Sequence, residues 1–455
     1  MSIIRPSRRH PRYLENEDGS TFIPVGCNIC FCRDATLDDT HVLQTFTRWM
    51  TDFASHGGNF MRLWLGTPFC NVVPERAGVY SQDALDHLRA LVALAERLGI
   101  RLKLTLEHFR FIGPDTRPAA FPGIISFANQ AYDKSHGGPA TDINEFFTSE
   151  AGQRAFLDKC RFLADAGIGD SPAVAIIELW NEINSLLPTR IWKPWTAQML
   201  PKVQRLFPRQ LITQSLGSFS GTNAWQLYDA LADLDDNPIL QAHRYLDPGA
   251  ELDVCRSAPI DVLAASAVRE LLDRRPDRPA LLAEVGAVEA NHARYSDLYE
   301  RDTQGVLLHD MLFAPFFAGS AGCGQPWHWD HIYLDRHHLY GHFRRFLNAL
   351  DGFDPIAERA RPFHTETHTL RCHGLLGTSQ ALIWCRDKAS TWQAELVDGQ
   401  PAATLTGQRL PLPARADCDC YLPWEDRRET PADGNGTATI TLPDFTRSIV
   451  VHCRF

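Results

Sequence analysis

Short apolar runs alternate with longer segments of helical period over the first three quarters of the chain. Apolar runs bounded by turn-forming residues predict strands, whereas apolar residues at i, i+3 and i+7 predict amphipathic helices. Eight strands are predicted in this part, at residues 22–28, 59–65, 100–106, 173–179, 210–216, 238–243, 279–284 and 316–324.

The clearest predicted helix follows the second of these strands. Leu85, Leu88, Val92 and Ala95 share one face with the later Leu98, and Gly99 provides a stop signal. Strands that alternate with helices are typical of parallel sheets, and eight such repeats predict a closed (β/α)₈ TIM barrel, an α/β fold with function at the carboxyl ends of its strands. Further helices are predicted at 39–54, 149–166, 190–206, 223–233, 259–273, 302–314 and 338–350.

The pattern changes beyond residue 352. Short alternating runs broken by Gly, Pro and Asp follow, without a recurrent helical period. They predict a small C-terminal antiparallel β-sandwich, so that the chain divides into a barrel domain with an N-terminal extension (1–352) and a sandwich domain (353–455). The runs that we interpret as strands are 381–387, 391–399, 403–408, 418–426, 437–444 and 448–455.

Composition and charge narrow the function classes. With 44% hydrophobic and 22% charged residues in 455, the chain resembles an ordinary globular protein. A formal net charge of −10 disfavours binding to nucleic acid or to anionic membranes. No apolar stretch approaches the roughly 20 residues of a membrane span, and the first residues do not resemble a secretory signal. We therefore expect a cytoplasmic protein.

The 12 cysteines are too dilute for a disulfide scaffold. Cys27, Cys30 and Cys32 form one cluster, whose first pair has the C-x-x-C spacing of zinc sites. A second ligand pair is missing nearby, so we interpret these residues as buried thiols, although a metal role stays open. Cys418 and Cys420, at alternate positions of a strand-like run, are interpreted in the same way.

Two glutamates follow predicted strands at positions where a carboxylate needs a task or a partner. Glu182 comes just after the fourth strand, in the run IIELWNEIN, and Glu284 closes the seventh. Strand ends of a barrel converge over its mouth. Two carboxyl groups about 5 Å apart are what a retaining glycosidase requires, one as acid/base and one as nucleophile. The alternative for either residue alone is a salt-bridged or capping role at the rim.

Trp180-Asn181-Glu182 after a strand, with a second Glu closing a later strand, resembles the clan A retaining glycoside hydrolases, and residues 20–350 are most similar to family 5. The resemblance implies that Glu182 is the acid/base, Glu284 the nucleophile, and Asn181 a contact to the substrate 2-hydroxyl. It further implies substrate-binding roles for Arg62, His108, His243, Tyr245 and one of Trp327 and Trp329.

Elementary electrostatics supports these roles. A cation beside Glu284, such as Arg62, should hold that carboxylate ionised, whereas burial near Trp180 should raise the pKa of Glu182. Tyr245 can donate to the nucleophile, and an aromatic face can stack on a pyranose. Taken singly, each of these residues also has a structural interpretation as an ion pair, a core histidine or packing.

Three features depart from the family pattern or compete with it. Ala283-Glu284-Val285-Gly286 lacks the polar or aromatic neighbour common beside the nucleophile, and Glu107 is a third rim carboxylate that could bind a sugar or pair with Arg110. A group of histidines invites a metal site, but the first strand lacks the H-x-H of metal-dependent barrel hydrolases, so we predict neither metal nor cofactor. These histidines are His328, His331, His337, His338 and His342.

The leading hypothesis is a retaining β-glycosidase that acts on oligosaccharides or small β-glycosides by double displacement. The alternative is a carbohydrate-binding protein on the same fold whose catalysis has lapsed. A long loop after the third strand could close one end of the cleft and give exo action. The sequence leaves open the sugar, the linkage and the oligomeric state. The loop is rich in phenylalanine, with Phe109, Phe111, Phe121 and Phe127.

Overall fold

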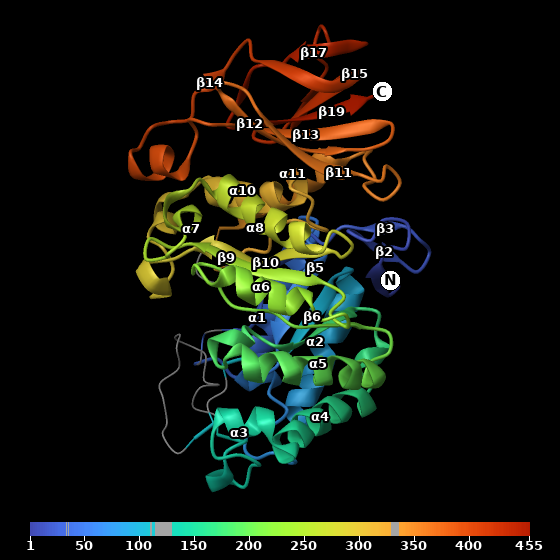
Figure 1. Ribbon diagram of the computed structural model, residues 1–455, viewed down its shortest axis with the longest axis vertical. Coiled ribbons are helices and arrows are strands. Elements are labelled where there is room, and N and C mark those ends of the chain that lie inside the picture. Colours follow the sequence, from blue (N-terminus) through green and yellow to red (C-terminus); the bar gives the residue numbers. More distant parts are fainter. Residues whose placement is uncertain (33, 35, 110–111, 114–129, 329–335) are drawn as a thin grey trace.

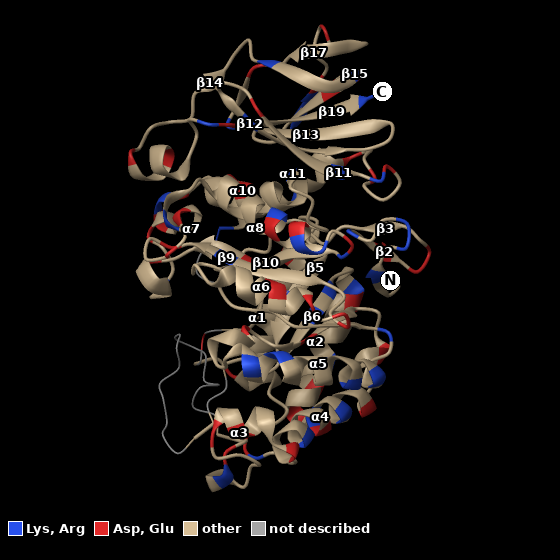
Figure 2. Cartoon of the chain, in the orientation of Figure 1, with Lys and Arg blue, Asp and Glu red and all other residues tan. Residues whose placement is uncertain are grey.

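The computed structural model describes all residues except 33, 35, 110–111, 114–129 and 329–335. It is an α/β protein in which parallel strands and their helices occupy most of the chain and an antiparallel sheet the C-terminal part (Figure 1). Among the described residues, no helix has both the length and the apolar composition that a membrane crossing needs. Acidic and basic residues are interspersed along helices such as α4 (Figure 2).

Seven of the eight predicted strands are found in two parallel sheets. The first has the order β4-β5-β6-β7-β8, and the second pairs β9 with β10. Their strands are β4 (Gly26–Cys27), β5 (Phe60–Trp64), β6 (Arg101–Glu107), β7 (Val174–Trp180), β8 (Leu211–Thr213), β9 (Leu240–Leu246) and β10 (Ala280–Ala287).

Backbone hydrogen bonds join the two sheets at both seams. At one, the N–H of Phe219, after β8, donates to the carbonyl of His243 in β9 (3.0 Å). At the other, the N–H of Ala321 donates to Ala280 of β10 (2.9 Å), and the N–H of Cys323 donates to Pro24, just before β4 (3.0 Å).

The prediction of an eighth strand at 316–324 was wrong in its first residues. Phe316 and Phe317 end helix α10, and no strand is assigned over the rest of the predicted range, 318–324. Ala321 and Cys323 in this range nevertheless make the hydrogen bonds of the second seam. Every residue of α10 is buried. A helix that is apolar all round has no periodic signal to tell it from a buried strand.

The helices lie outside these sheets and match the predicted segments closely. In α2, Ser81 caps the N-terminus by accepting from the N–H of Ala84, and Gly99 ends the helix in the left-handed conformation that glycine favours. The helices are α1 (Asp39–Ser55), α2 (Gln82–Leu98), α3 (Ile143–Thr148), α4 (Glu150–Asp165), α5 (Thr189–Leu206), α6 (Ala224–Ala232), α7 (Asp253–Ser257), α8 (Ile260–Arg274), α9 (Leu298–Arg301), α10 (Val306–Phe317) and α11 (Gly341–Leu350).

The predicted first strand, 22–28, is two strands. Its first residue closes an N-terminal antiparallel sheet that the sequence analysis did not predict, formed by β1 (Ile4–Pro6), β2 (Leu14–Asn16) and β3 (Thr21–Phe22). Only Gly26 and Cys27 pair with β5.

The C-terminal sheet has the order β11-β12-β13-β19-β15-β16, with β17 also paired to β15. One face buries aliphatic residues and five cysteines, and the other packs on α10 (Figure 1). There Trp384 contacts the rings of Phe313 and Phe317. The strands are β11 (Arg361–Glu366), β12 (Leu370–Leu376), β13 (Gln380–Asp387), β14 (Thr404–Leu405), β15 (Arg409–Leu422), β16 (Arg427–Glu429), β17 (Thr437–Thr441), β18 (Phe445–Thr446) and β19 (Ser448–Arg454).

The prediction of a strand at 391–399 was wrong. Residues Gln393–Val397 form a turn of π-helix. The indole N–H of Trp392 donates to the carbonyl of Ala258 (3.0 Å), next to α8. A tertiary contact of this kind overrides the local strand preference.

Candidate active site

The two predicted carboxyl groups meet at the carboxyl ends of β7 and β10. Glu182 begins the turn Ile183–Ser185 directly after β7 with a left-handed backbone (φ 47°), and Glu284 lies within β10 where the pairing register with β9 shifts. A side-chain oxygen of Glu182 lies within 4.8 Å of one of Glu284. A non-glycine residue in this conformation costs free energy, and such strain gathers at functional sites.

His243 on β9 lies between the two carboxyl groups. Its Nδ1 is 2.7 Å from Oε1 of Glu182 and 3.3 Å from Oε1 of Glu284. Burial, followed by the nearby cations Arg62 and Lys103, lowers the pKa of His243 well below its usual value. The ring is therefore neutral at pH 7 and shares a proton with Glu182 rather than forming an ion pair.

Arg62 on β5 holds Glu284 in place. One guanidinium nitrogen donates to Oε1 of Glu284, and the other donates to Glu178 and to Oδ1 of Asn181 (2.6 Å). The hydroxyl of Tyr245 donates to Oε2 of Glu284. Both oxygens of Glu284 thus accept a hydrogen bond from a fixed donor.

A second cation completes this charged layer. Nζ of Lys103 lies 3.1 Å from Oε2 of Glu178, and both side chains are fully buried. Burial lowers the pKa of Lys103 to about 8, which leaves it protonated at pH 7. Two cations, Arg62 and Lys103, therefore face three carboxyl groups, Glu178, Glu182 and Glu284.

Burial and the excess carboxyl together determine the pKa values of Glu182 and Glu284. Burial, then the charge of Glu284, raises the pKa of Glu182 well above its usual range. Burial also raises the pKa of Glu284, although Arg62 and Tyr245 act in the opposite direction. The expectation of opposite shifts was therefore wrong, because desolvation outweighs the arginine at Glu284. The larger rise at Glu182 still makes it the group that holds the proton.

An aromatic wall flanks the charged layer. The ring of Trp64 on β5 packs against His108 (4.4 Å between ring centroids) and Trp327 (5.1 Å between ring centroids). The Arg62 guanidinium lies 5.5 Å from the centroid of the Trp64 ring. Phe109 also contacts Trp64. His108 and Trp327 thus lie beside the predicted site, whereas Trp329 lies outside the described residues, as do Phe111, Phe121 and Phe127.

Three residues at the site were missed by the sequence analysis: Glu178, Lys103 and Trp64. Glu178 and Lys103 are charged residues inside apolar strands, which is a signal in itself, because an unpaired charge is costly to bury. Trp64 is two residues after Arg62, and alternate residues of a strand share a face.

Glu107 and the histidines singled out in the sequence have partners of their own in the structure. Glu107 pairs with Nζ of Lys159 (2.8 Å) and accepts from the Tyr132 hydroxyl (2.9 Å), while Arg110 lies outside the described residues. The described histidines after residue 327 lie apart: His328 is near Tyr299, His338 contacts the carbonyl of Thr303, and His342 that of Gln304. His337 pairs with Asp52, and His331 lies outside the described residues.

The thiols of the first cluster show no metal-binding arrangement within the described part of the chain. Cys27 and Cys30 are buried and Cys32 is half-buried. The ligand atoms of Glu182, His243 and Glu284 are close enough to share a cation. However, the guanidinium of Arg62 is hydrogen-bonded to Glu284 and would repel one.

No protein-family model and no curated protein matches the sequence. Among solved structures, a glycoside hydrolase is similar over 100% of this chain and 97% of its own, with a TM-score of 0.62 and 12% identity. An exo-β-1,4-mannosidase from Opitutaceae bacterium strain TAV5 is similar over 77% and 62%, with a TM-score of 0.51 and 18% identity. A glycoside hydrolase family 5 mannosidase from Rhizomucor miehei is similar over 71% and 85%, with a TM-score of 0.50 and 11% identity. The chain therefore has the fold of these glycoside hydrolases.

Proposed function

We propose that the protein is a retaining β-glycosidase of the family 5 type and that the two parallel sheets close into a (β/α)₈ barrel over residues 1–352, followed by a β-sandwich domain over 353–455. The observation that carries the proposal is the spacing of Glu182 and Glu284, with oxygens within 4.8 Å. Retaining glycosidases need their carboxyl groups about 5 Å apart, whereas inverting enzymes leave room for a water at roughly 6.5–9.5 Å.

The surroundings of each carboxyl support its role. Glu284, fixed by Arg62 and Tyr245, attacks the anomeric carbon and forms a glycosyl ester as the bond to the leaving oxygen breaks. Glu182 gives its proton to that oxygen. It then removes a proton from the water that cleaves the ester, which releases the sugar with the β configuration and restores both groups.

Three further residues would bind the sugar or position the acid/base. Oδ1 of Asn181 accepts from Arg62, so its amide nitrogen can donate to the 2-hydroxyl. His243 keeps Glu182 in place through the 2.7 Å contact. Trp327, in the aromatic wall with Trp64 and His108, offers a face for the pyranose.

We further propose β-mannosides as the substrate and exo action as the mode. Two of the similar structures are mannosidases, one of them an exo-β-1,4-mannosidase. Hydrolysis of nitrophenyl β-mannoside should exceed that of the β-glucoside, β-galactoside and β-xyloside, with Glu284→Ala as the inactive control. With oligosaccharides, single sugars should be released from one end, and mid-chain fragments would contradict exo action.

The stereochemistry gives the sharpest test of the mechanism. Proton NMR during early hydrolysis should show the β anomer first, before mutarotation. A 2-deoxy-2-fluoro glycoside should label Glu284, because the ester is then formed but hydrolysed slowly. A first-formed α anomer would refute the retaining mechanism, and no turnover of any activated glycoside would favour the lapsed carbohydrate-binding protein.

A further inference from the structure

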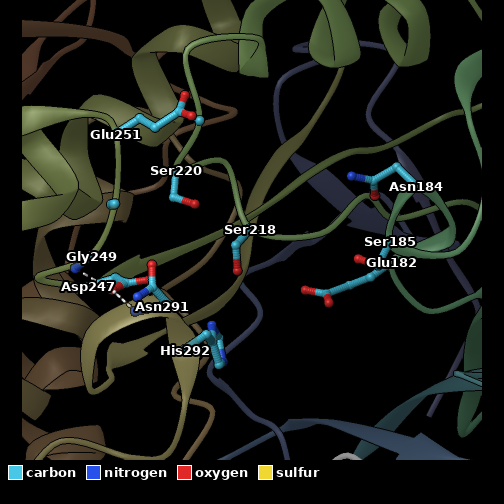
Figure 3. A pocket seen from close by; sticks show the side chains of 12 residues that line it. Glu182, Asn184, Ser185, Ser218, Ser220, Asp247, Gly249, Glu251, Asn291 and His292 are labelled. Atoms are coloured by element: carbon cyan, nitrogen blue, oxygen red, sulfur yellow. Dashed lines mark hydrogen bonds between the residues drawn. The ribbon is translucent and has the colours of Figure 1, made fainter.

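A pocket of about 510 Å³ opens beside Glu182, a volume in the range of small-molecule sites. In Figure 3, Glu182, Asn184 and Ser185 form its right-hand side, directly after β7. The opposite side is formed by segments that follow β8, β9 and β10. Among the described residues that line it, Glu284 is missing. The pocket therefore extends from the acid/base away from the nucleophile.

This position decides which part of a substrate the pocket can receive. If Glu182 protonates the departing oxygen, the group attached to that oxygen lies on the Glu182 side of the bond that breaks. The pocket is then the place of the leaving group. The inference that follows rests on the proposed function.

The side chains that line the pocket are mainly polar, and they include the imidazole of His292. Ser218 and Ser220 present hydroxyls, Asn291 an amide, and Asp247 and Glu251 carboxylates (Figure 3). Among the described lining residues there is no Lys or Arg and no Trp, Tyr or Phe. A ligand is therefore held by hydrogen bonds and not by stacking on a large ring.

Asp247 and Glu251, on the side of the pocket opposite Glu182, are each held by hydrogen bonds to one of their two carboxylate oxygens. Oε2 of Glu251 accepts from the N–H and the hydroxyl of Thr222 (2.7 and 2.9 Å), and these donors lower the pKa of Glu251. Oδ1 of Asp247 accepts from the backbone N–H groups of Gly249 and Asn291 (2.8 and 2.9 Å). In the described structure no hydrogen bond reaches the second oxygen of either group, so each can accept from a ligand.

The wall that carries Asp247 is rigidly built. Asn291 and His292 both have left-handed backbones (φ 61° and 59°), which non-glycine residues adopt only when their surroundings enforce it. A Cβ on Gly249 would come within 2.5 Å of the backbone nitrogen of Asn291, so the two segments are in close contact. His292 packs edge-on against Tyr245, the residue that donates to Glu284.

We propose that this pocket selects an uncharged, hydroxyl-rich leaving group, a sugar or polyol, and rejects anionic ones, with Asp247 and Glu251 as the residues that determine the choice. Their free oxygens accept from substrate hydroxyls. No Lys or Arg is among the described lining residues, and the nearby Arg256, which donates to the backbone carbonyls of Ala250 and Glu251, is paired with Asp253. The charge of Asp247 and Glu251 therefore repels a carboxylate or phosphate on the leaving group.

The first test uses the unaltered protein and two substrates that share the same glycosyl group. One carries glucose as the leaving group and the other glucuronate, which adds a single carboxylate. The ratio of kcat/KM should favour glucose by at least about 30-fold, since Asp247 and Glu251 both repel the added carboxylate. Equal rates would overturn the inference.

The second test removes the two charges. In Asp247→Asn with Glu251→Gln, the amide oxygens can keep the backbone and Thr222 contacts. We expect kcat/KM for the glucose substrate to fall by about 10-fold and the preference over glucuronate to shrink to about 3-fold. The control, Glu75→Gln with Asp398→Asn, removes two exposed carboxylates that do not line the pocket and should change neither value.

A 2,4-dinitrophenyl glycoside separates this inference from the proposed function. It departs without protonation and makes few hydrogen bonds in the pocket, so the double variant should hydrolyse it within about 3-fold of the original rate. Turnover of this substrate with no discrimination between glucose and glucuronate would refute the inference alone. No turnover of it by the unaltered protein would refute both.

Discussion

Two buried layers of charged residues lie in different parts of the molecule, and they differ in how their charges are matched. Between α8, α10 and the C-terminal sheet, Arg371 pairs with Asp261 (2.6 and 2.9 Å) and Arg386 with Asp310 (2.8 and 3.2 Å). Each arginine has its own carboxylate and meets it through two hydrogen bonds. Within β5, β6, β7 and β10 and just after β7, two cations face three carboxyl groups, and one of these carboxyl residues, Glu182, has a strained backbone.

This difference distinguishes a layer that holds two parts of the fold together from a layer that can exchange a proton. A pair matched one to one has its charges satisfied, so it serves to dock the C-terminal sheet on α8 and α10. In a buried layer with one carboxyl in excess, burial and then the charge of Glu284 raise the pKa of Glu182, so that this layer keeps a proton. We therefore expect substitutions in the two layers to have opposite signatures, on turnover at the one and on stability at the other.

The largest effect should come from Glu284→Gln. Because covalent catalysis has no substitute for the carboxylate, kcat should fall by at least about 10³-fold. The glutamine oxygen can still accept from Arg62, so thermal unfolding should change little. Kinetics and thermal unfolding of the same preparation measure the effect on turnover and on stability. A fall in kcat of less than about 10-fold would show that Glu284 is not the nucleophile.

Asp261→Asn should instead lower stability and leave turnover nearly unchanged. The change leaves the buried Arg371 without its charge partner, which typically costs about 3 kcal/mol in the free energy of unfolding. Denaturant unfolding measures the loss, and kcat below the transition should stay within about 2-fold, because Asp261 does not touch the site. A comparable fall in kcat of the folded protein would mean that the two layers are coupled.

Glu182→Ala should produce an effect that depends on the leaving group. Turnover of glycosides with poor leaving groups should drop by about 10²-fold, whereas activated aryl glycosides barely need protonation and should change far less. Loss of activity above the raised pKa of Glu182 should vanish from the pH profile of the variant. Azide should restore turnover by attacking the glycosyl ester, and equal losses on both substrate classes without rescue would assign the proton to another group.

Much of the fold could be predicted because its signals are local. The periodic face of α2, its serine cap and its terminal glycine lie within 20 residues of one another. The prediction failed where the signal was absent, as in the fully buried α10, or where a distant contact prevailed, as at Trp392 on Ala258.

The site divides in the same way. Residues that directly follow or close strands, such as Glu182 and Glu284, could be proposed from the sequence, because a carboxylate at the carboxyl end of a buried strand has few structural uses. Glu178 and Lys103 lie inside strands and are joined to Arg62 or to each other across gaps of 75 residues or more, so nothing local reveals the pair. The charge excess that raises the pKa of Glu182 can be counted only once these partners are known.

The smallest effect should come from Asp310→Asn, the other half of the docking layer. Burial raises the pKa of Asp310 to about 6, whereas hydrogen bonds and Arg371 lower that of Asp261 below its usual value despite burial. At pH 7 the surroundings of Asp310 disfavour its charge, so the neutral asparagine should lower the free energy of unfolding by only about 1 kcal/mol.

The raised pKa of Asp310 also makes this effect depend on pH. It contributes stability that is complete below pH 3.8 and is lost as the pH rises through about 6. The stability gap between the unaltered protein and Asp310→Asn should therefore narrow from pH 5 to pH 7, while the gap for Asp261→Asn stays constant over that range. Denaturant unfolding at the two pH values measures both stability gaps. Equal losses of unfolding free energy for the two variants at pH 7 would show that the two ion pairs contribute equally to stability.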